Sequence, residues 1–286
     1  MSEYLYTTPP LDRSVGLRRR IMSSAMGTFG GWGYREIQVP MLHFFEALKP
    51  GLDADQIERS FRFVDRDGNL MVLRPDVTPA IAQMFAYQIR APELPLRVSY
   101  THKVVRIERT FTRNELETYQ LGIEHIGGAD ELASDLEVLI LAMRTLDSIG
   151  LPDWRVNLAD HRIAHMLLKA TGAPHVRREE IRRAVIARDA DEVRAVLNRL
   201  GARAHHRDAL IALTSNSGGT EQLDVLTQIF EGRREELKRL NHVRSIHATL
   251  EELGMADRVD VELGEIDGAS YYTGIGFTLV SQGAPR

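Results

Sequence analysis

The 286-residue chain contains no cysteine, which excludes disulfide bonds, thiolate zinc sites and cysteine nucleophiles together. It also lacks any apolar run near the ~20 residues that a membrane-spanning helix needs. Positive charge is not in excess, because 36 Lys and Arg stand against 40 Asp and Glu, so no overall field attracts nucleic acid. The first residues, MSEYLYTTPP, have no apolar signal core, and we expect a cytoplasmic protein.

Hydrophobic residues make up 43% of the chain, enough for a real core in one large domain or a domain with an insert. The apolar spacing of residues 12–30 predicts an opening helix that ends at GGWGY. YREIQVP (34–40) alternates apolar and polar residues and predicts a strand that stops at Pro40. Two strands around an Asp67-Gly68 turn are predicted for residues 60–75. A helix is predicted for 78–89.

Further strands are predicted at roughly 95–108 and 117–127, on either side of a polar loop. Residues 131–150 predict a helix that closes on Gly150, and WRVNLAD (154–160) predicts a strand. Periodic charged and apolar residues then favour four or five helices before strand composition resumes near residue 258. The pattern predicts an α+β fold, with residues 1–160 and 256–286 forming the main domain and 161–255 a helical insertion.

Polar residues that could form a site occur first in LRPDVTPAIA (73–82). Asp76 and Thr78 lie between a strand end and a helix, where a carboxylate and a hydroxyl could meet a ligand. Taken alone, these residues favour a purely structural interpretation, with Thr78 as the helix N-cap, Pro79 at its first position and Asp76 as a turn former.

Charged side chains alternate with apolar ones on the two later strands. Arg106 and Glu108 are two residues apart and face the same side of their strand, and Gln120 and Glu124 share a face of the next. We expect these groups to converge on one concave sheet, although exposed surface charge is the simpler explanation for any single pair. The ten histidines show no metal-ligand spacing, and we assign no metal and no cofactor.

Three segments resemble the class II aminoacyl-tRNA synthetases, and the histidyl enzymes most of all. VVRIER (104–109) with TYQLGIEHIG (118–127) resembles their motif 2, and GWGYREIQVP their motif 1. RPDVT resembles an Arg-Pro-Glu-x-Thr segment, and EIDGASYYTGIG (265–276) resembles the histidine-specific segment Arg-Gly-Leu-Asp-Tyr-Tyr-Thr. The resemblance implies the synthetase fold, an antiparallel sheet flanked by helices with a helical insertion.

The resemblance also implies roles for individual residues. Arg106 and Glu108 match the residues that hold ATP. The residues that match the histidine pocket are Asp76, Thr78, Gln120, Glu124, Tyr271 and Tyr272.

Several positions depart from the family. Asp267 stands where the catalytic arginine is expected, Leu116 replaces a further arginine and Ser270 replaces an aspartate. A carboxylate at the arginine position would repel the phosphate of the adenylate, so binding is expected to be kept and catalysis lost.

The 286 residues include no motif 3 and no anticodon-binding domain, and whether Arg286 is the native end stays open. With the altered histidine segment and the segments RPDVTPAIA and YYTGIGF, the chain resembles the regulatory subunits of short-form ATP phosphoribosyltransferase, which act in the first step of histidine biosynthesis. That resemblance implies a non-catalytic subunit that activates a catalytic partner and mediates histidine feedback. It also implies a homodimeric core within a hetero-oligomer, often an octamer. Two alternatives remain open at this point: a histidyl-tRNA synthetase or a fragment of one, and a tRNA-binding module built on an inactive core.

Overall fold

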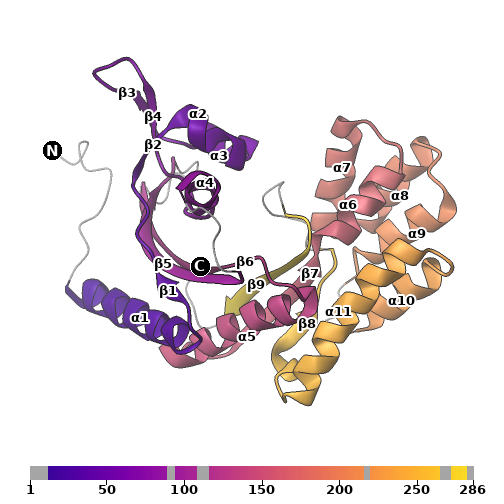
Figure 1. The fold of residues 1–286 in the computed structure, drawn as a ribbon. Coiled ribbons are helices and arrows are strands. Elements are labelled where there is room, and N and C mark those ends of the chain that lie inside the picture. The colour runs from indigo at the N-terminus through magenta and orange to yellow at the C-terminus, as the bar shows by residue number, and fades with distance from the viewer. Residues whose placement is uncertain (1–11, 89–93, 108–115, 216–219, 265–271, 282–286) are drawn as a thin grey trace. The chain divides into compact units, whose positions relative to one another are not determined.

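The computed structural model describes residues 12–88, 94–107, 116–215, 220–264 and 272–281 (Figure 1). Its helices and strands confirm the α+β class that the sequence predicts. The chain forms two compact units, Met1–Gly150 and Leu151–Arg286. The division predicted from the sequence, with 161–255 as an insertion, stays a prediction. Along the described residues, no helix has the length and apolar character needed to cross a bilayer.

The first unit is built around two long antiparallel strands, β5 (Leu96–Val105) and β6 (Glu117–Ile126), which pair along their whole length. The short β1 (Arg35–Glu36) joins β5 in parallel, giving the order β1-β5-β6. Helix α1 (Asp12–Gly31) and helix α5 (Glu131–Ile149) are those predicted for these segments. A cluster of buried residues joins them to the sheet: Ala25, Phe29, Tyr34 and Leu141, with Leu121 and Ile123 packed against it.

The strand predicted for residues 34–40 is shorter than expected. Only Arg35 and Glu36 belong to the sheet ladder, although Ile37 N still donates to Ser99 O at 2.9 Å. At Val39 the partner changes, because its N–H donates to the His102 imidazole at 3.2 Å. The acceptor for Val39 N is a side-chain nitrogen instead of a backbone carbonyl oxygen, so the strand ladder ends before Val39. The alternation of apolar and polar residues does not predict this change of acceptor.

A smaller antiparallel sheet has the order β2-β4-β3, from β2 (Leu42–Phe44), β3 (Arg62–Val64) and β4 (Leu70–Leu73). The predicted hairpin turn at Asp67-Gly68 is confirmed, and Gly68 has φ +85°, a conformation that glycine adopts without strain. The Asp65 carboxylate also accepts from Asn69 N at 2.8 Å. Short helices and one longer helix accompany this sheet: α2 (Phe45–Leu48), η1 (Lys49–Gly51), α3 (Ala54–Glu58) and α4 (Thr78–Gln88).

The main core of this unit lies where α4 and the small sheet meet β5. Val72, Val77, Ile81 and Val98 are at most 3% exposed there. The position of α4 matters for the site, because the turn between β4 and α4 and the first residue of α4 are held against β6 of the long sheet.

The second unit has β7 (Trp154–Asp160) at the centre of a three-stranded sheet. β8 (Val259–Val261) is parallel to it on one side and β9 (Ile275–Ser281) antiparallel on the other. Six helices lie between β7 and β8 among the described residues, where four or five were predicted. They are α6 (His161–Ala170), α7 (His175–Ile186), α8 (Ala190–Arg199), α9 (Ala204–Ala212), α10 (Glu221–Ile229) and α11 (Arg234–Glu252), followed by the 3-10 turn η2 (Ala256–Arg258).

A buried ion pair ties this sheet to the helices. Asp160, the last residue of β7, accepts from Arg162 N at 2.8 Å and so caps α6. Its other oxygen accepts from Arg239 Nε at 2.8 Å and from Nη2 at 2.6 Å. The two side chains are 0% and 5% exposed, so neither charge has water as an alternative partner. Loss of either residue would leave a buried charge without compensation.

We therefore expect Arg239→Met to lower the free energy of unfolding by about 3–5 kcal/mol, the usual cost of breaking a buried pair from one side. Arg244→Met is the matched control on the same helix, because Arg244 pairs with Asp224 at the exposed surface. That variant should cost no more than about 1 kcal/mol. Urea unfolding followed by circular dichroism measures both, and equal losses would contradict the importance of the buried pair.

Candidate functional site

The candidate site begins where β4 ends, at a turn that a buried arginine holds in place. Arg74 is 3% exposed and donates to Lys103 O at 3.0 Å and to Pro40 O at 2.8 Å. Burial lowers the pKa of its guanidinium, and its hydrogen-bond acceptors among the described residues are backbone oxygens. Burial and the nearby Arg74 charge also lower the pKa of His102, which accepts from Val39 N. These contacts fix the strand end from which the next residues project.

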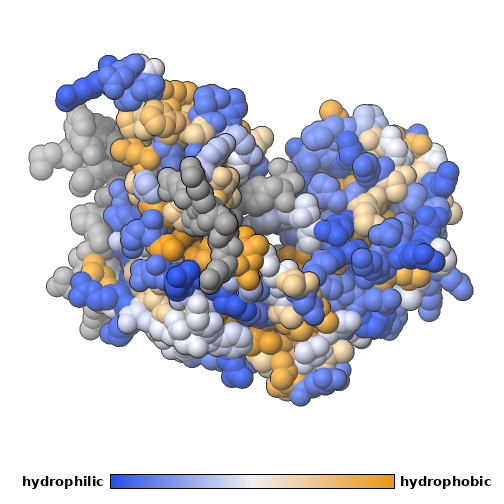
Figure 2. Space-filling view, in the orientation of Figure 1, coloured by the Kyte–Doolittle hydropathy of each residue, from blue (hydrophilic) through white to orange (hydrophobic). Residues whose placement is uncertain are grey.

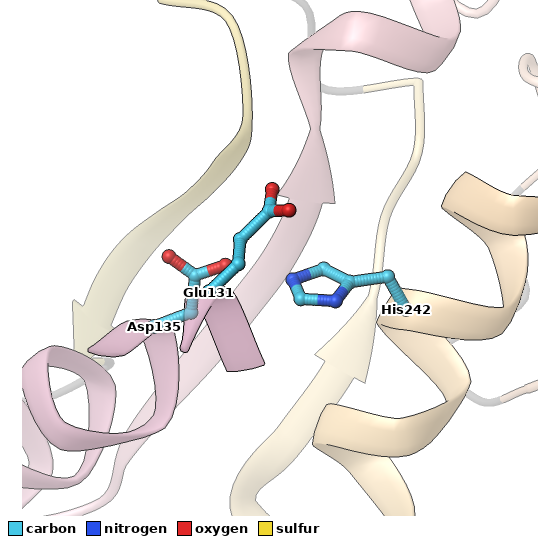
Figure 3. A group of neighbouring side chains, drawn as sticks. All are labelled: Glu131, Asp135 and His242. Carbon is cyan, nitrogen blue, oxygen red and sulfur yellow. The ribbon is translucent and has the colours of Figure 1, made fainter. Parts of the chain in front are cut away.

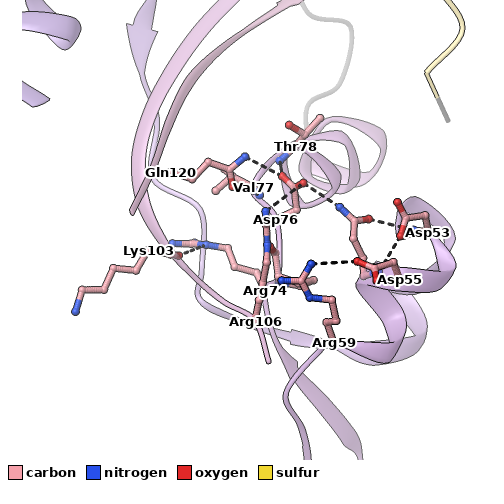
Figure 4. A network of polar contacts seen from close by, with 12 residues as sticks. Asp53, Asp55, Arg59, Arg74, Asp76, Val77, Thr78, Lys103, Arg106 and Gln120 are labelled. Atoms are coloured by element: carbon pink, nitrogen blue, oxygen red, sulfur yellow. Dashed lines mark hydrogen bonds and ion pairs between the residues drawn. The ribbon is translucent and has the colours of Figure 1, made fainter. Parts of the chain in front are cut away.

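Asp76 follows this turn and is the centre of a polar network (Figure 4). One carboxylate oxygen accepts from Gln56 Nε2 at 2.9 Å. The other accepts from Gln120 Nε2 at 3.0 Å and from Thr78 N at 3.1 Å. Three donors thus hold a side chain that is only 9% exposed. Such a carboxylate has a fixed position, as a group that orients a ligand requires.

β6 contributes two further polar side chains to the same place. Gln120 and Glu124 face one side of the strand, with Gly122 between them. Gln120 Oε1 accepts from Val77 N at 3.2 Å, and Glu124 Oε1 accepts from the Thr78 hydroxyl at 2.7 Å. Side chains that the sequence singled out therefore join β6 to the turn after β4 and to the start of α4.

The glycine in the middle of β6 has a steric reason. A Cβ at position 122 would lie 2.6 Å from the Tyr100 hydroxyl, which is far too close. Tyr100 pairs with Gly122 across the strands and is 4% exposed, and its hydroxyl accepts from Gln120 Nε2 at 3.4 Å. The absence of a side chain at Gly122 thus leaves room for the Tyr100 ring, whose hydroxyl accepts a hydrogen bond from Gln120.

The site carries more negative than positive charge. Burial raises the pKa of Glu124, the charge of Asp76 raises it further, and the Thr78 hydrogen bond opposes both. Arg106 is the cation closest to Asp76 among the contacts found, with Nη2 3.7 Å from a carboxylate oxygen. Among the described residues, Asp76 and Glu124 bring two carboxylates to the site and only Asp76 has an ion pair, with Arg106, so a ligand that brings a positive charge would improve the balance. An ammonium group fits this requirement.

Arg106 is engaged with its own chain. Its Nε donates to Pro75 O, in addition to the long ion pair with Asp76. Its backbone N donates to Leu116 O at 2.9 Å, across the start of the loop. The guanidinium therefore braces the turn that carries Asp76.

The structure brings together most of the residues that the sequence predicted for one site. Asp76, Thr78, Arg106, Gln120 and Glu124 meet in the first unit. The simple alternative for Thr78 was a helix cap, but its hydroxyl donates to Glu124 instead. Asp76 does hold the turn, through Thr78 N, as well as meeting Gln120 and Gln56. The ligand roles of these residues remain predictions.

The structure does not place the other predicted residues relative to this cluster. Tyr272 belongs to the second unit, where its ring centroid lies 5.3 Å from that of His161. Glu108, Tyr271 and Asp267 lie outside the described residues. The charge reversal at position 267 is thus a feature of the sequence, and its consequence belongs with the proposals below.

Two residues of the network were missed by the sequence analysis. Gln56 lies three residues after Asp53 and forms a capping box with it, since Asp53 N donates to Oε1 and Gln56 N to Asp53. The Asp-x-x-Gln spacing is a signal for a helix start, but it does not reveal that Nε2 reaches Asp76. Tyr100 could have been found only from Gly122, because a glycine inside a strand indicates a close approach.

We do not assign a metal site to the acidic residues near the start of α5. Glu131 and Asp135 lie one turn apart on α5, and His242 lies on α11 (Figure 3). The two carboxylates belong to the first unit and the imidazole to the second. Residues of separate units do not define a site by themselves.

The raised pKa of Glu124 predicts a pH-dependent effect of its replacement. The folded state holds the proton more tightly than the unfolded chain, so Glu124 costs stability as pH rises above the ordinary value of 4.5. Glu124→Gln removes that cost and keeps an oxygen for Thr78. We expect the variant to be more stable than the wild type near pH 7, with the difference shrinking toward pH 4. Urea unfolding across this range measures it, and a difference independent of pH would contradict the assignment.

Comparison with known proteins extends over almost the whole chain. A profile of the histidyl-tRNA synthetase family matches residues 10–286. An ATP phosphoribosyltransferase regulatory subunit from Syntrophotalea carbinolica is 30% identical over 258 residues, which cover 90% of this chain and 60% of that protein. One from Desulfitobacterium hafniense is 28% identical over 284 residues, covering 96% and 72%. The chain therefore spans less than two thirds of the first of these relatives.

Solved structures share the fold at low sequence identity. A Bacillus halodurans protein described as an ATP phosphoribosyltransferase regulatory subunit/histidyl-tRNA synthetase has a TM-score of 0.85 and 24% identity, covering 98% of this chain and 72% of that one. A chain of the ATP phosphoribosyl transferase complex from Thermotoga maritima has a TM-score of 0.72 and 20% identity, covering 98% and 90%. At these identities the likeness concerns the fold.

Proposed function

The chain belongs to the histidyl-tRNA synthetase family, and we propose that it is a non-catalytic regulatory subunit of ATP phosphoribosyltransferase. In this proposal it activates a separate catalytic subunit and makes that subunit sensitive to histidine. The curated relatives that carry the regulatory-subunit name support this assignment, since they match between 86% and 96% of the chain. The similarity to a chain of the Thermotoga maritima complex supports a catalytic partner.

The ligand we propose for the site is histidine, and the network around Asp76 is the observation that carries this step. Asp76 and Glu124 are acceptors, and both are held in place by hydrogen bonds from neighbouring elements. The α-ammonium of an amino acid offers three donors and a positive charge to such a pair. An imidazole N–H could supply a further donor. The excess of negative charge in the site therefore favours a free amino acid over an anion.

The same site is poorly suited to activating an amino acid with ATP. The resemblance implies that Arg106 contacts a phosphate. In the structure its guanidinium donates to Pro75 O and pairs with Asp76. Asp267 supplies a negative charge in the segment where the family has an arginine. Stabilising a transferring phosphoryl group requires cations aimed at its oxygens. Binding an amino acid does not, so the two functions can be lost separately.

Regulation follows if histidine and the catalytic subunit favour different arrangements of this chain. Linkage then requires that each ligand change the affinity of the other by the same factor. The turn at Pro75–Thr78 is a candidate for the element that responds, because it joins α4, β6 and Arg106 through side chains that a ligand would contact. In the complex, we propose a homodimer of this chain as the core of the hetero-oligomer.

Histidine binding can be tested by isothermal titration calorimetry of the whole chain. We expect wild-type protein to bind, and Gln120→Ala to weaken the affinity by roughly 10- to 100-fold, because Asp76 loses a donor and Val77 N an acceptor. Glu117→Gln is the matched control on the same strand, since Glu117 pairs with Lys103 at the surface. It should bind as the wild type does. Absence of heat with and without the catalytic subunit would contradict the proposed pocket.

The alternative is an active histidine-activating enzyme, which the family membership itself keeps in view. It requires histidine-dependent exchange of pyrophosphate into ATP by the purified chain. We expect no exchange above a blank reaction. Exchange that disappears in Gln120→Ala would establish the alternative and overturn the non-catalytic assignment.

A further inference from the structure

The side-chain amide of Gln56 has a partner at each end. Its Oε1 accepts from Asp53 N at 3.0 Å, and its Nε2 donates to Asp76 Oδ2 at 2.9 Å. A backbone N–H can only donate and an ionised carboxylate can only accept, so the amide fits in one orientation. Gln56 therefore presents its NH2 group to Asp76, and a flip of the amide would break both bonds.

The two carboxylate oxygens of Asp76 are not equally occupied. Oδ1 accepts from both Gln120 Nε2 and Thr78 N. Among the described residues, Gln56 is the one hydrogen-bond donor to Oδ2, because Arg106 Nη2 is 3.7 Å from this oxygen, beyond hydrogen-bond distance. Each oxygen of an ionised carboxylate accepts about two hydrogen bonds. The remaining place is therefore on Oδ2, the oxygen that Gln56 holds.

Helix α3, which carries Gln56, is fixed at both ends. At its start, Gln56 N donates to Asp53 Oδ1 at 2.8 Å and so takes part in the capping box. Just past its end, Ile107 N donates to Arg59 O at 2.9 Å, and Arg59 Nε donates to Ile107 O at 3.2 Å. Ile57 packs against the main core between these points. A helix of five residues depends on such contacts, because a helix this short is marginal by itself.

We infer that Gln56 is a positioning residue of the amino-acid site, and that it holds Asp76 Oδ2 where the ammonium group of the ligand binds. This inference rests on the proposed function and adds the side chain that orients its acceptor. Figure 4 shows Asp76 between Gln120 on β6 and the start of α3 at Asp53. The amino acid contacts Asp76, and Gln56 acts on the affinity through Asp76.

The ammonium is the part of the ligand that this arrangement serves. It has N–H donors for the open place on Oδ2 and a positive charge for the carboxylate. Imidazolepropionate is histidine without its amino group, so it keeps the imidazole and the carboxylate and loses this contact. A residue that only caps α3 would act on the shape of the pocket and weaken both ligands by the same factor. A positioning residue weakens histidine alone.

The test is isothermal titration calorimetry of the whole chain, with histidine and with imidazolepropionate, on the wild type and on Gln56→Met. Methionine keeps the length of the side chain and removes the donor to Asp76. We expect the Kd for histidine to rise roughly 10-fold or more, because a hydrogen bond to a charged group is lost. The Kd for imidazolepropionate should stay unchanged, so the preference for histidine falls by the same factor.

Asp53→Ala is the matched control in the same capping box. It removes the carboxylate that accepts from Gln56 N, but it keeps the backbone N–H that donates to Gln56 Oε1. This variant should be less stable and keep the wild-type preference for histidine. Failure of the wild type to bind histidine would overturn the proposed pocket and this inference together. Binding by the wild type, with an unchanged preference in Gln56→Met, would overturn this inference alone.

Amide hydrogen exchange of the wild type covers the case in which Gln56→Met fails to fold. Saturating histidine should slow exchange at the amides of Gln56 and Ile57, which donate to Asp53, and imidazolepropionate should not. The turn at residues 65–69 is the internal control, because it lies at the hydrophilic tip of the β3-β4 hairpin (Figure 2) and the Asp65 carboxylate is bonded within the turn. Equal slowing by the two ligands, or no slowing in α3, would overturn the inference.

Discussion

Three hydrogen-bond donors from three different elements fix the position of the buried Asp76 carboxylate. The relative positions of the other polar side chains in the site depend on this carboxylate. Gln56 reaches it from α3, Gln120 from β6 and Thr78 N from the first turn of α4. Each donor also serves its own element, as when Gln56 closes the capping box of α3. Removing the carboxylate would leave several buried donors without partners, so the network is stable only as a whole.

Under the proposed function, this network is what lets a synthetase scaffold bind an amino acid without activating it. A receptor needs fixed acceptors for an ammonium group, and Asp76 with Glu124 provides them. An adenylating enzyme needs, in addition, cations directed at a phosphate. Here Arg106 is directed at the protein's own turn, and position 267 carries an acid. These charges are consistent with the proposed regulatory role.

Local signals in the sequence were sufficient for much of the fold. The Asp67-Gly68 turn, the paired strands β5 and β6 and the closing glycine of α5 all follow from short-range chemistry. So does the shared face of Gln120 and Glu124, because strand periodicity requires it. Contacts between distant residues were not predictable: Asp160 and Arg239 are 79 residues apart, and Gln56 meets Asp76 from another element. The early end of β1 was also not predictable, because it depends on a contact between distant residues: Val39 N donates to the His102 imidazole on β5.

The most direct test of the central claim is reconstitution with a short-form catalytic subunit, measuring phosphoribosyl transfer from phosphoribosyl pyrophosphate to ATP. The account predicts that adding this chain raises the rate. It also predicts that histidine lowers the rate with the wild type and has a much weaker effect with Gln120→Ala. An unchanged rate on adding the chain, or equal inhibition by histidine with both proteins, would contradict it.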